Sequence, residues 1–338
     1  MPANPVVSIV LPTYNSAEYI GASISSVLGQ RFGDFELLVL DNASSDGTAE
    51  VVASFHDPRL RYRRNPVNLG FAGNVELGRS VARAPYVAMQ NSDDQWEPDH
   101  LARTVGLLAA APQLAFVHTR ATTIAANGLP FGETVGRWEQ VTPGRRAIVN
   151  CFVAGFSFPT MVIRNQMLRQ VPPLPAAGPW AKFADSWLFL RLCLLGDVGF
   201  VPERLVRYRV HRGSIMFECY GDGSYFRRHL DAARDLFKWP EVLAVLSPRD
   251  QRRILRQVAR DAVAALPAVR EQASRSRLLL NYCEIAASVP GVLLHPEPWA
   301  RLAFGLLPPS GIECLRQAKR KRWLSRHRHG TVSAAPGN

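Results

Sequence analysis

The stretch that decides the fold is VSIVLPTYN at residues 7–15, and YVAMQNSDD at residues 86–94 is its counterpart. Each stretch begins with an apolar run that is typical of a buried strand and ends in polar, turn-forming residues. In an open α/β sheet, ligands bind outside the carboxyl ends of the strands. We therefore expect the polar residues after the two strands to share one crevice, namely Thr13, Tyr14, Asn15, Asp93 and Asp94.

The adjacent carboxylates of Asp93 and Asp94 suit a hard divalent cation. Mg²⁺ is usually bound by one or two carboxylates together with substrate phosphates, and we expect the same of Mn²⁺. The pattern therefore predicts an enzyme that acts on a metal-bound nucleoside diphosphate. A plain Ser-Asp-Asp turn, with one aspartate as the cap of a helix after Pro98, is the simpler alternative, and the two roles are compatible.

The chain has 338 residues, 47% of them hydrophobic, and a formal net charge of +12. This length predicts one large domain with additions or two domains. A basic protein suits an anionic partner, but residues 316–330 hold seven Lys or Arg, two His and no acid, which explains much of the imbalance. No nucleic-acid-binding module or interleaved aromatic pattern is present, so we expect no nucleic-acid partner.

Five cysteines without a C-x-x-C pair predict reduced thiols in a cytosolic setting. The amino terminus lacks the basic and apolar regions of a signal peptide, and no segment has the roughly 20 apolar residues that span a bilayer. We therefore expect a cytoplasmic protein. Its basic tail would attract an anionic membrane surface, on the inner face of the cytoplasmic membrane, and a solvated charged end is the alternative.

Strand and helix patterns alternate in residues 6–118, with strands expected at 6–11, 35–40, 60–64 and 86–90. Repeated βα units imply a doubly wound, mostly parallel α/β sheet. Further extended segments are expected at 158–164 and 199–210, and a helix at 185–195. From about residue 225 the pattern is helical, and residues 331–338 are expected to be disordered.

Five motifs occur in a characteristic order: PTYN (12–15), DNASSDGT (41–48), SDD (92–94), ADSWLFLRL (184–192) and YRVH (208–211). Together they resemble the family 2 glycosyltransferases of the GT-A fold, over residues 6–215. The resemblance implies a donor-binding half (1–118), an acceptor-binding half of the same domain (119–215) and a helical carboxyl-terminal region with a basic tail (216–330).

The resemblance also implies an activity. The enzyme would be an inverting transferase that moves a sugar from a nucleoside diphosphate sugar, with UDP or dTDP favoured, to a hydroxyl of a glycan or lipid-linked acceptor. The setting would be bacterial surface polysaccharide assembly, and the cofactor Mg²⁺ or Mn²⁺. The residues expected to contact the donor nucleotide are Pro12, Thr13, Tyr14, Asn15, Asp41, Asn68, Gly70, Ser92 and Asp93.

Asp41 would accept a hydrogen bond from a uracil-type imide or a ribose hydroxyl, whereas an Asx turn is the alternative and fits Asp46 better. Asp185 would be the catalytic base that takes the proton of the attacking hydroxyl. A helix cap is its alternative role. Asp93 and Asp94 would bind the metal, with His211 as a third ligand, and Arg209 and Arg212 would neutralise the diphosphate.

Two other functions are alternative interpretations of the sequence. Asn91 and Ala184 stand where this family often has acids, so a non-catalytic nucleotide-sugar-binding or scaffold subunit is an alternative. A sugar-1-phosphate nucleotidyltransferase would need a glycine-rich, basic loop after the first strand. PTYNS at residues 12–16 supplies no such loop, which disfavours that activity.

Overall fold

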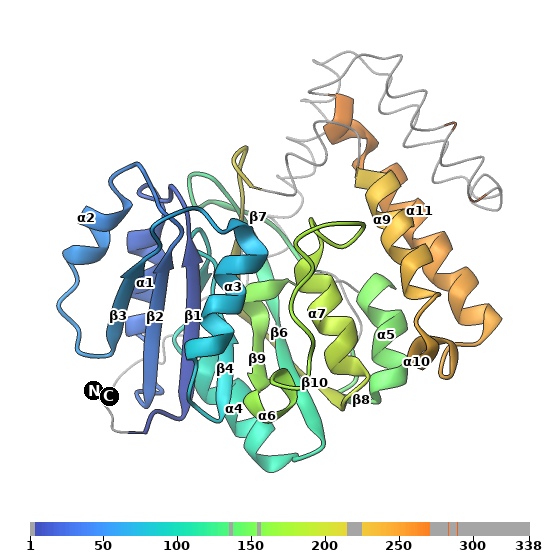
Figure 1. Cartoon of the computed structure of the whole chain (residues 1–338), viewed down its shortest axis with the longest axis horizontal. Coiled ribbons are helices and arrows are strands. Elements are labelled where there is room, and N and C mark those ends of the chain that lie inside the picture. Colours follow the sequence, from blue (N-terminus) through green and yellow to red (C-terminus); the bar gives the residue numbers. More distant parts are fainter. Residues whose placement is uncertain are drawn as a thin grey trace, which may run out of the picture.

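The computed structural model describes residues 4–134, 138–153, 157–214 and 225–270, together with Cys283 and Val289 (Figure 1). These residues form one ten-stranded sheet in the order β3-β2-β1-β4-β9-β6-β10-β5, with β7 beside β6 and β8 beside β10. Within the described ranges, no helix is long and apolar enough to cross a membrane.

The first half of the sheet consists of βα units. Strands β1 (Val7–Thr13), β2 (Phe35–Asp41), β3 (Leu60–Arg64) and β4 (Tyr86–Met89) are parallel. The helices between and after them are α1 (Ile20–Leu28), α2 (Thr48–Ala53), α3 (Gly70–Val81) and α4 (His100–Ala110). Thr13 pairs with Asp41, so the ends of β1 and β2 meet at one edge of the sheet.

The second half of the sheet mixes directions. Its strands are β5 (Gln95–Trp96), β6 (Leu114–Ala125), β7 (Pro130–Glu133), β8 (Val141–Thr142), β9 (Met161–Arg164) and β10 (Asp197–Val210). Strand β9 runs antiparallel between β4 and β6, whereas β6 and β10 are parallel to each other. Its helices are α5 (Gly144–Val153), α6 (Asn165–Leu168) and α7 (Ala184–Cys193).

Helices cover both faces of this sheet (Figure 1). Successive side chains of a strand point to opposite faces. In β1, Val10 therefore joins the core under α3, α5 and α7, while Ile9 and Leu11 join the core under α1 and α4. The predicted doubly wound, mostly parallel α/β fold is thus confirmed.

The carboxyl-terminal helices α9 (Tyr225–Leu236), α10 (Pro240–Leu243) and α11 (Pro248–Arg270) pack against the second half of the sheet domain. The Arg191 guanidinium of α7 lies 3.6 Å from the centroid of the Trp239 ring. Trp180 Nε1 donates to Asp235 Oδ2 at 2.8 Å. The predicted helical region is confirmed up to residue 270, whereas the basic tail and residues 331–338 lie outside the described residues.

Two predicted elements have different bounds. The strand expected at 158–164 begins as the 3₁₀ turn Phe158–Thr160, in which Pro159 cannot donate a ladder hydrogen bond. The sequence also predicts a helix that is capped by Asn15 or Ser16 and runs to about Gln30. In the structure it begins only at Ile20, because residues 16–19 form a turn that fastens the end of β1 to the following loops.

Candidate active site

A cavity of about 1640 Å³ opens at the carboxyl edge of the sheet, and residues of the donor half, the acceptor half and α11 line it. Most of the residues predicted from the sequence line this cavity. They are Pro12, Thr13, Tyr14, Asn15, Asn68, Gly70, Ser92, Asp93, Asp185, His211 and Arg212. Asp41, Asp94 and Arg209 are absent from its lining and are buried instead.

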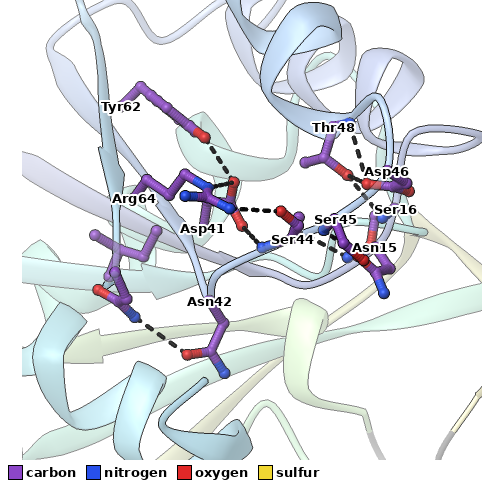
Figure 2. A network of polar contacts seen from close by, with 12 residues as sticks. Asn15, Ser16, Asp41, Asn42, Ser44, Ser45, Asp46, Thr48, Tyr62 and Arg64 are labelled. Atoms are coloured by element: carbon purple, nitrogen blue, oxygen red, sulfur yellow. Dashed lines mark hydrogen bonds and ion pairs between the residues drawn. The ribbon is translucent and has the colours of Figure 1, made fainter. Parts of the chain in front are cut away.

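Asp41 lies at the end of β2 and is hydrogen-bonded to the side chain of Tyr62 and to the loop that follows the strand (Figure 2). Its Oδ1 accepts a hydrogen bond from Ser44 N at 2.8 Å, and its Oδ2 accepts one from Tyr62 Oη at 2.6 Å. Ser44 Oγ in turn accepts a bond from Asn15 N at 2.9 Å. The carboxylate is fully buried, so the structure gives Asp41 the role of ordering the loop after β2, and the predicted contact with a base does not follow from its position.

Asp46 has the turn role that the sequence favoured. Its Oδ1 accepts a bond from Thr48 N at 3.1 Å at the start of α2, and its Oδ2 accepts one from Ala17 N at 3.0 Å (Figure 2). The Ser16 and Ser92 hydroxyls lie 2.8 Å apart. The loops that follow β1, β2 and β4 therefore form one connected wall, as expected for strand ends at one edge of a sheet.

Asp93 and His211 form a pair at the floor of the cavity. His211 Nε2 lies 2.9 Å from Asp93 Oδ2, although the two residues are 118 positions apart in the chain. Their side chains are 24% and 16% exposed, so both reach the cavity. The Tyr19 ring packs on the imidazole with a centroid distance of 4.9 Å and fixes its orientation.

Asp94 points away from the cavity. Its Oδ1 accepts a bond from Arg209 N at 2.6 Å, and its Oδ2 accepts one from Asn91 Nδ2 at 2.8 Å. Burial, together with the charge of Asp93, raises the pKa of Asp94. Contrary to the prediction of two adjacent metal ligands, Asp94 holds the end of β10 against the end of β4.

Arg209 is also a structural residue. Its guanidinium donates to the backbone oxygens of Asp93 and Ala126, each at 2.8 Å, and lies 4.9 Å from the Tyr19 ring centroid. The guanidinium of Arg209 is therefore buried and hydrogen-bonded within the protein. This differs from the prediction that it would lie beside a diphosphate. Arg212 lines the cavity and remains the candidate for that role.

The residues fit a divalent cation that is held jointly with a substrate. In the described part of the chain, no group of three or more His, Cys, Asp or Glu side chains is arranged to bind a metal. Asp93 and His211 supply two donors, and a cation that binds substrate phosphates needs few protein ligands. A tightly held structural metal does not fit this arrangement.

Asp185 lies in the first turn of α7, on the acceptor side of the cavity. The helix follows Phe183, so Asp185 is not its N-cap, although its Oδ1 accepts a bond from Ser186 N at 2.7 Å. Burial raises the pKa of Asp185, and the bonds from Ser186 oppose this effect. A carboxylate with a raised pKa is a stronger base, which is what proton abstraction from a hydroxyl requires.

The carboxyl-terminal helices complete the acceptor side, which sequence reasoning did not predict. His229 of α9 and Gln257 and Asp261 of α11 line the cavity. Gln257 Nε2 donates to Asp261 Oδ1 at 2.8 Å, and burial raises the pKa of Asp261 to about 6. The sequence contains one local indication of this role, because Asp261 is the single acid within VARDAVAAL (residues 258–266), a largely apolar stretch of a basic helix.

Comparison with known proteins places the chain in a family. The model of glycosyl transferase family 2 matches residues 8–171. The putative teichuronic acid biosynthesis glycosyltransferase TuaG of Bacillus subtilis is 30% identical over 218 residues, which cover 62% of this chain and 81% of that protein. The chain therefore belongs to glycosyl transferase family 2, and the predicted resemblance is confirmed.

Two further relatives have a lower sequence identity. The UDP-Glc:alpha-D-GlcNAc-diphosphoundecaprenol beta-1,3-glucosyltransferase WfgD of Escherichia coli is 28% identical over 70% of this chain and 88% of that protein. An uncharacterized glycosyltransferase of Nostoc is 24% identical over 211 residues, which cover 61% of this chain and 65% of that protein.

Solved structures share the fold. Staphylococcus aureus TarS 1–349 in complex with UDP-GlcNAc has a TM-score of 0.53 at 16% identity, over 85% of this chain and 90% of that one. The mannosyltransferase PcManGT of Pyrobaculum calidifontis, in complex with GDP-Man and Mn²⁺, has a TM-score of 0.54 at 18% identity, over 90% and 88%. Both agree with the predicted GT-A architecture.

Proposed function

We propose that the protein transfers a sugar from a nucleoside diphosphate sugar to an acceptor hydroxyl, with inversion at the anomeric carbon. The observation that carries this proposal is that one cavity contains both the Asp93–His211 pair and the carboxylate of Asp185. The pair suits the diphosphate end of a donor, and the carboxylate suits the hydroxyl of an acceptor.

The nucleotide would lie against the wall made by the loops after β1 and β4. That wall offers backbone groups of residues 12–15, the side chain of Ser92, and Asn68 and Gly70 at the start of α3. UDP or dTDP is favoured as the nucleotide. The complex of TarS with UDP-GlcNAc and the name of WfgD support a uridine donor, whereas the complex of PcManGT with GDP-Man shows that the fold also accepts guanosine.

A Mg²⁺ or Mn²⁺ ion would be held by Asp93 and His211 together with oxygens of the diphosphate. As a Lewis acid it would stabilise the negative charge on the leaving nucleoside diphosphate. Arg212, at the same side of the cavity wall as His211, would add a charge-assisted hydrogen bond to that group. Asp94 and Arg209 would act only by holding the ends of β4 and β10 in place.

Asp185 would take the proton of the acceptor hydroxyl as its oxygen attacks the anomeric carbon. The new carbon–oxygen bond forms on the face opposite the diphosphate, and the electron pair of the broken bond leaves with the nucleoside diphosphate. General base catalysis of this kind contributes about 10² to 10⁴ in rate. Asp261 and Gln257 would hydrogen-bond the acceptor from the opposing helix α11.

The acceptor is proposed to be a glycan or a lipid-linked saccharide, in bacterial surface polysaccharide assembly. The names of TuaG and WfgD support this setting. Attachment to the inner face of the cytoplasmic membrane through residues 316–330 stays a prediction, because that tail lies outside the described residues.

A thermal-shift screen of UDP, dTDP, GDP and CMP, each with Mn²⁺ or with EDTA, tests the donor proposal. We expect a stabilisation by UDP or dTDP that needs the metal, since a ligand at 100 times its Kd stabilises the native state by about 2.7 kcal/mol. The corresponding UDP- or dTDP-sugars are then incubated with lipid-linked acceptors, and the anomeric configuration of the product is read by NMR. A shift without any transfer would favour the non-catalytic scaffold reading, and a retained anomer would refute inversion.

A further inference from the structure

We infer that the exposed face of helix α11 docks the protein on an anionic lipid bilayer. This face carries five arginines, all exposed: Arg249, Arg252, Arg253, Arg256 and Arg260. An α-helix turns by about 100° and rises by about 1.5 Å per residue, so the five positions lie within an arc of about 100° and along about 17 Å. They form one continuous stripe of positive charge, which we call the arginine stripe.

The charge of the arginine stripe is not neutralised by ion pairs in the described part of the chain. None of its five guanidinium groups forms an ion pair within the described ranges. The two acids of the same helix form no ion pair with the stripe: Asp250 Oδ2 accepts a bond from the Ser247 hydroxyl at 2.6 Å, and Asp261 Oδ1 accepts one from Gln257. Arg249 and Arg253 still interact with Asp250 through space, so part of the positive charge is offset and a net excess remains. A net positive stripe of this kind attracts an anionic surface.

Several arginines elsewhere on the surface form ion pairs. Arg31 pairs with Asp99 at 2.7 Å, and Arg207 pairs with Glu97 at 2.8 Å. Arg103 pairs with Glu203. Arg63, Arg145 and Arg169 are also exposed without an ion pair in the described ranges, but they lie on three separate elements, whereas the five arginines of α11 lie on one face of one helix.

The rest of α11 fits an interfacial element. Its opposite face is buried through Ile254 and Val258, which pack into the core beside α5 and α9. Just before the helix, Leu243 and Val245 are 50% and 40% exposed. A helix with a basic face and nearby exposed apolar side chains is typical of segments that lie in a membrane interface.

The shape and chemistry of the stripe select a bilayer. Helix α11 lies at one side of the molecule (Figure 1), and the arginines of its exposed face are free to meet an extended surface. Arginine binds phosphate groups in a bidentate manner, and lipid headgroups present such groups in a plane. The stripe contains no aromatic side chain on which a base could stack, which argues against a single-stranded nucleic acid.

Docking through this face would place the cavity beside the lipid headgroups. Gln257 and Asp261 line the cavity from the sector of α11 next to the arginine stripe. An acceptor attached to lipid would then enter the cavity directly from the membrane surface. This inference goes beyond the proposed transfer and does not depend on the donor, the metal or the base.

Vesicle co-sedimentation of the full chain tests the inference. Vesicles of phosphatidylcholine alone are compared with vesicles that contain 30% phosphatidylglycerol, a composition chosen as about one-third anionic lipid so that a negative surface potential is present. The stripe variant Arg252→Ala/Arg256→Ala/Arg260→Ala is compared with a control of equal charge change, Arg31→Ala/Arg63→Ala/Arg103→Ala, on the first half of the sheet domain away from α11 (Figure 1). Alanine favours helix, so the stripe variant should fold, which its unfolding temperature verifies.

We expect the wild type and the control to bind the anionic vesicles alike, and the stripe variant to bind on the order of 100-fold more weakly. Each arginine near the surface contributes about 1 kcal/mol to binding, and about 1.4 kcal/mol corresponds to a tenfold change in affinity. Wild-type binding should also weaken as NaCl rises from 0.1 to about 1 M, over which the Debye length falls from about 10 to 3 Å. Equal binding of stripe variant and wild type, equal binding to neutral vesicles, or a loss seen only when Arg320, Lys321 and Arg322 of the tail are replaced by Ala would each overturn the inference.

Discussion

The two adjacent aspartates after β4 should behave oppositely when each is replaced by alanine. Asp94→Ala removes a fully buried carboxylate and leaves Arg209 N and Asn91 Nδ2 without their acceptor. A hydrogen bond to a charged group stabilises the folded state by about 1.5–3 kcal/mol. Removing the buried charge also removes its desolvation cost, which offsets part of the loss of the two hydrogen bonds. We expect the free energy of unfolding to fall by about 3 kcal/mol.

Asp93→Ala removes a partly exposed side chain whose partner is His211, while the bond from Arg209 Nε to the Asp93 backbone oxygen remains. A pair of this kind contributes at most about 1 kcal/mol to stability. We therefore expect nearly wild-type unfolding for Asp93→Ala, but no metal-dependent stabilisation by UDP.

Urea unfolding followed by tryptophan fluorescence gives both free energies, and thermal shifts with UDP and Mn²⁺ give the binding. The measurement with nucleotide is made on the folded fraction of each variant. If Asp94→Ala unfolds like the wild type and loses metal-dependent binding, the buried aspartate is the metal ligand and the structural assignment of the two residues is refuted.

Three further outcomes are expected. Asp261→Asn should raise the acceptor KM about tenfold, since one hydrogen bond is worth about 1.4 kcal/mol, and leave donor binding unchanged; an unaltered acceptor KM would remove Asp261 from the acceptor site. Gly144→Ala should lower the free energy of unfolding by roughly 3 kcal/mol, because the new Cβ would lie 2.1 Å from Cys193 O. Gly106→Ala in α4, where the new Cβ would meet no atom within 4 Å, should raise the free energy of unfolding by up to about 1 kcal/mol; chemical denaturation measures both changes. Burial lowers the pKa of His100 to about 3 from 6.5, so the unfolded chain is protonated first as the pH falls. Relative to His100→Phe, the wild type should therefore lose about 2 kcal/mol of unfolding free energy between pH 6.5 and 5, and parallel pH profiles of the two proteins would contradict this.

The sequence located the crevice because strand ends can be recognised locally. The apolar runs before Asn15 and before Asp93 end at the same edge of a parallel sheet, and the loops after them therefore meet. Chemically identical neighbours cannot be distinguished in this way. Whether Asp93 or Asp94 faces the cavity depends on Arg209, which is 115 positions from Asp94 and whose backbone N–H binds one carboxylate and not the other.

Contacts made by packing between distant elements were also not predicted. The sequence identified α11 as helical but contained no local signal for the element against which it packs. Its approach to α5 and α9 brings Asp261 into the cavity and leaves Arg256 on the outer face. Likewise, a pattern of Asp followed by an apolar helix could not distinguish a helix cap from the first-turn position that Asp185 occupies.

The most direct test of the proposed function is single-turnover sugar transfer by the wild type and by Asp185→Asn, with donor binding measured on the same samples. Asparagine keeps the shape of the side chain and an oxygen that accepts the bond from Ser186 N, but it cannot take a proton. We expect donor binding to be unchanged and transfer to slow by about 10² to 10⁴. Transfer at more than a tenth of the wild-type rate would show that another group is the base and would contradict the central role of Asp185.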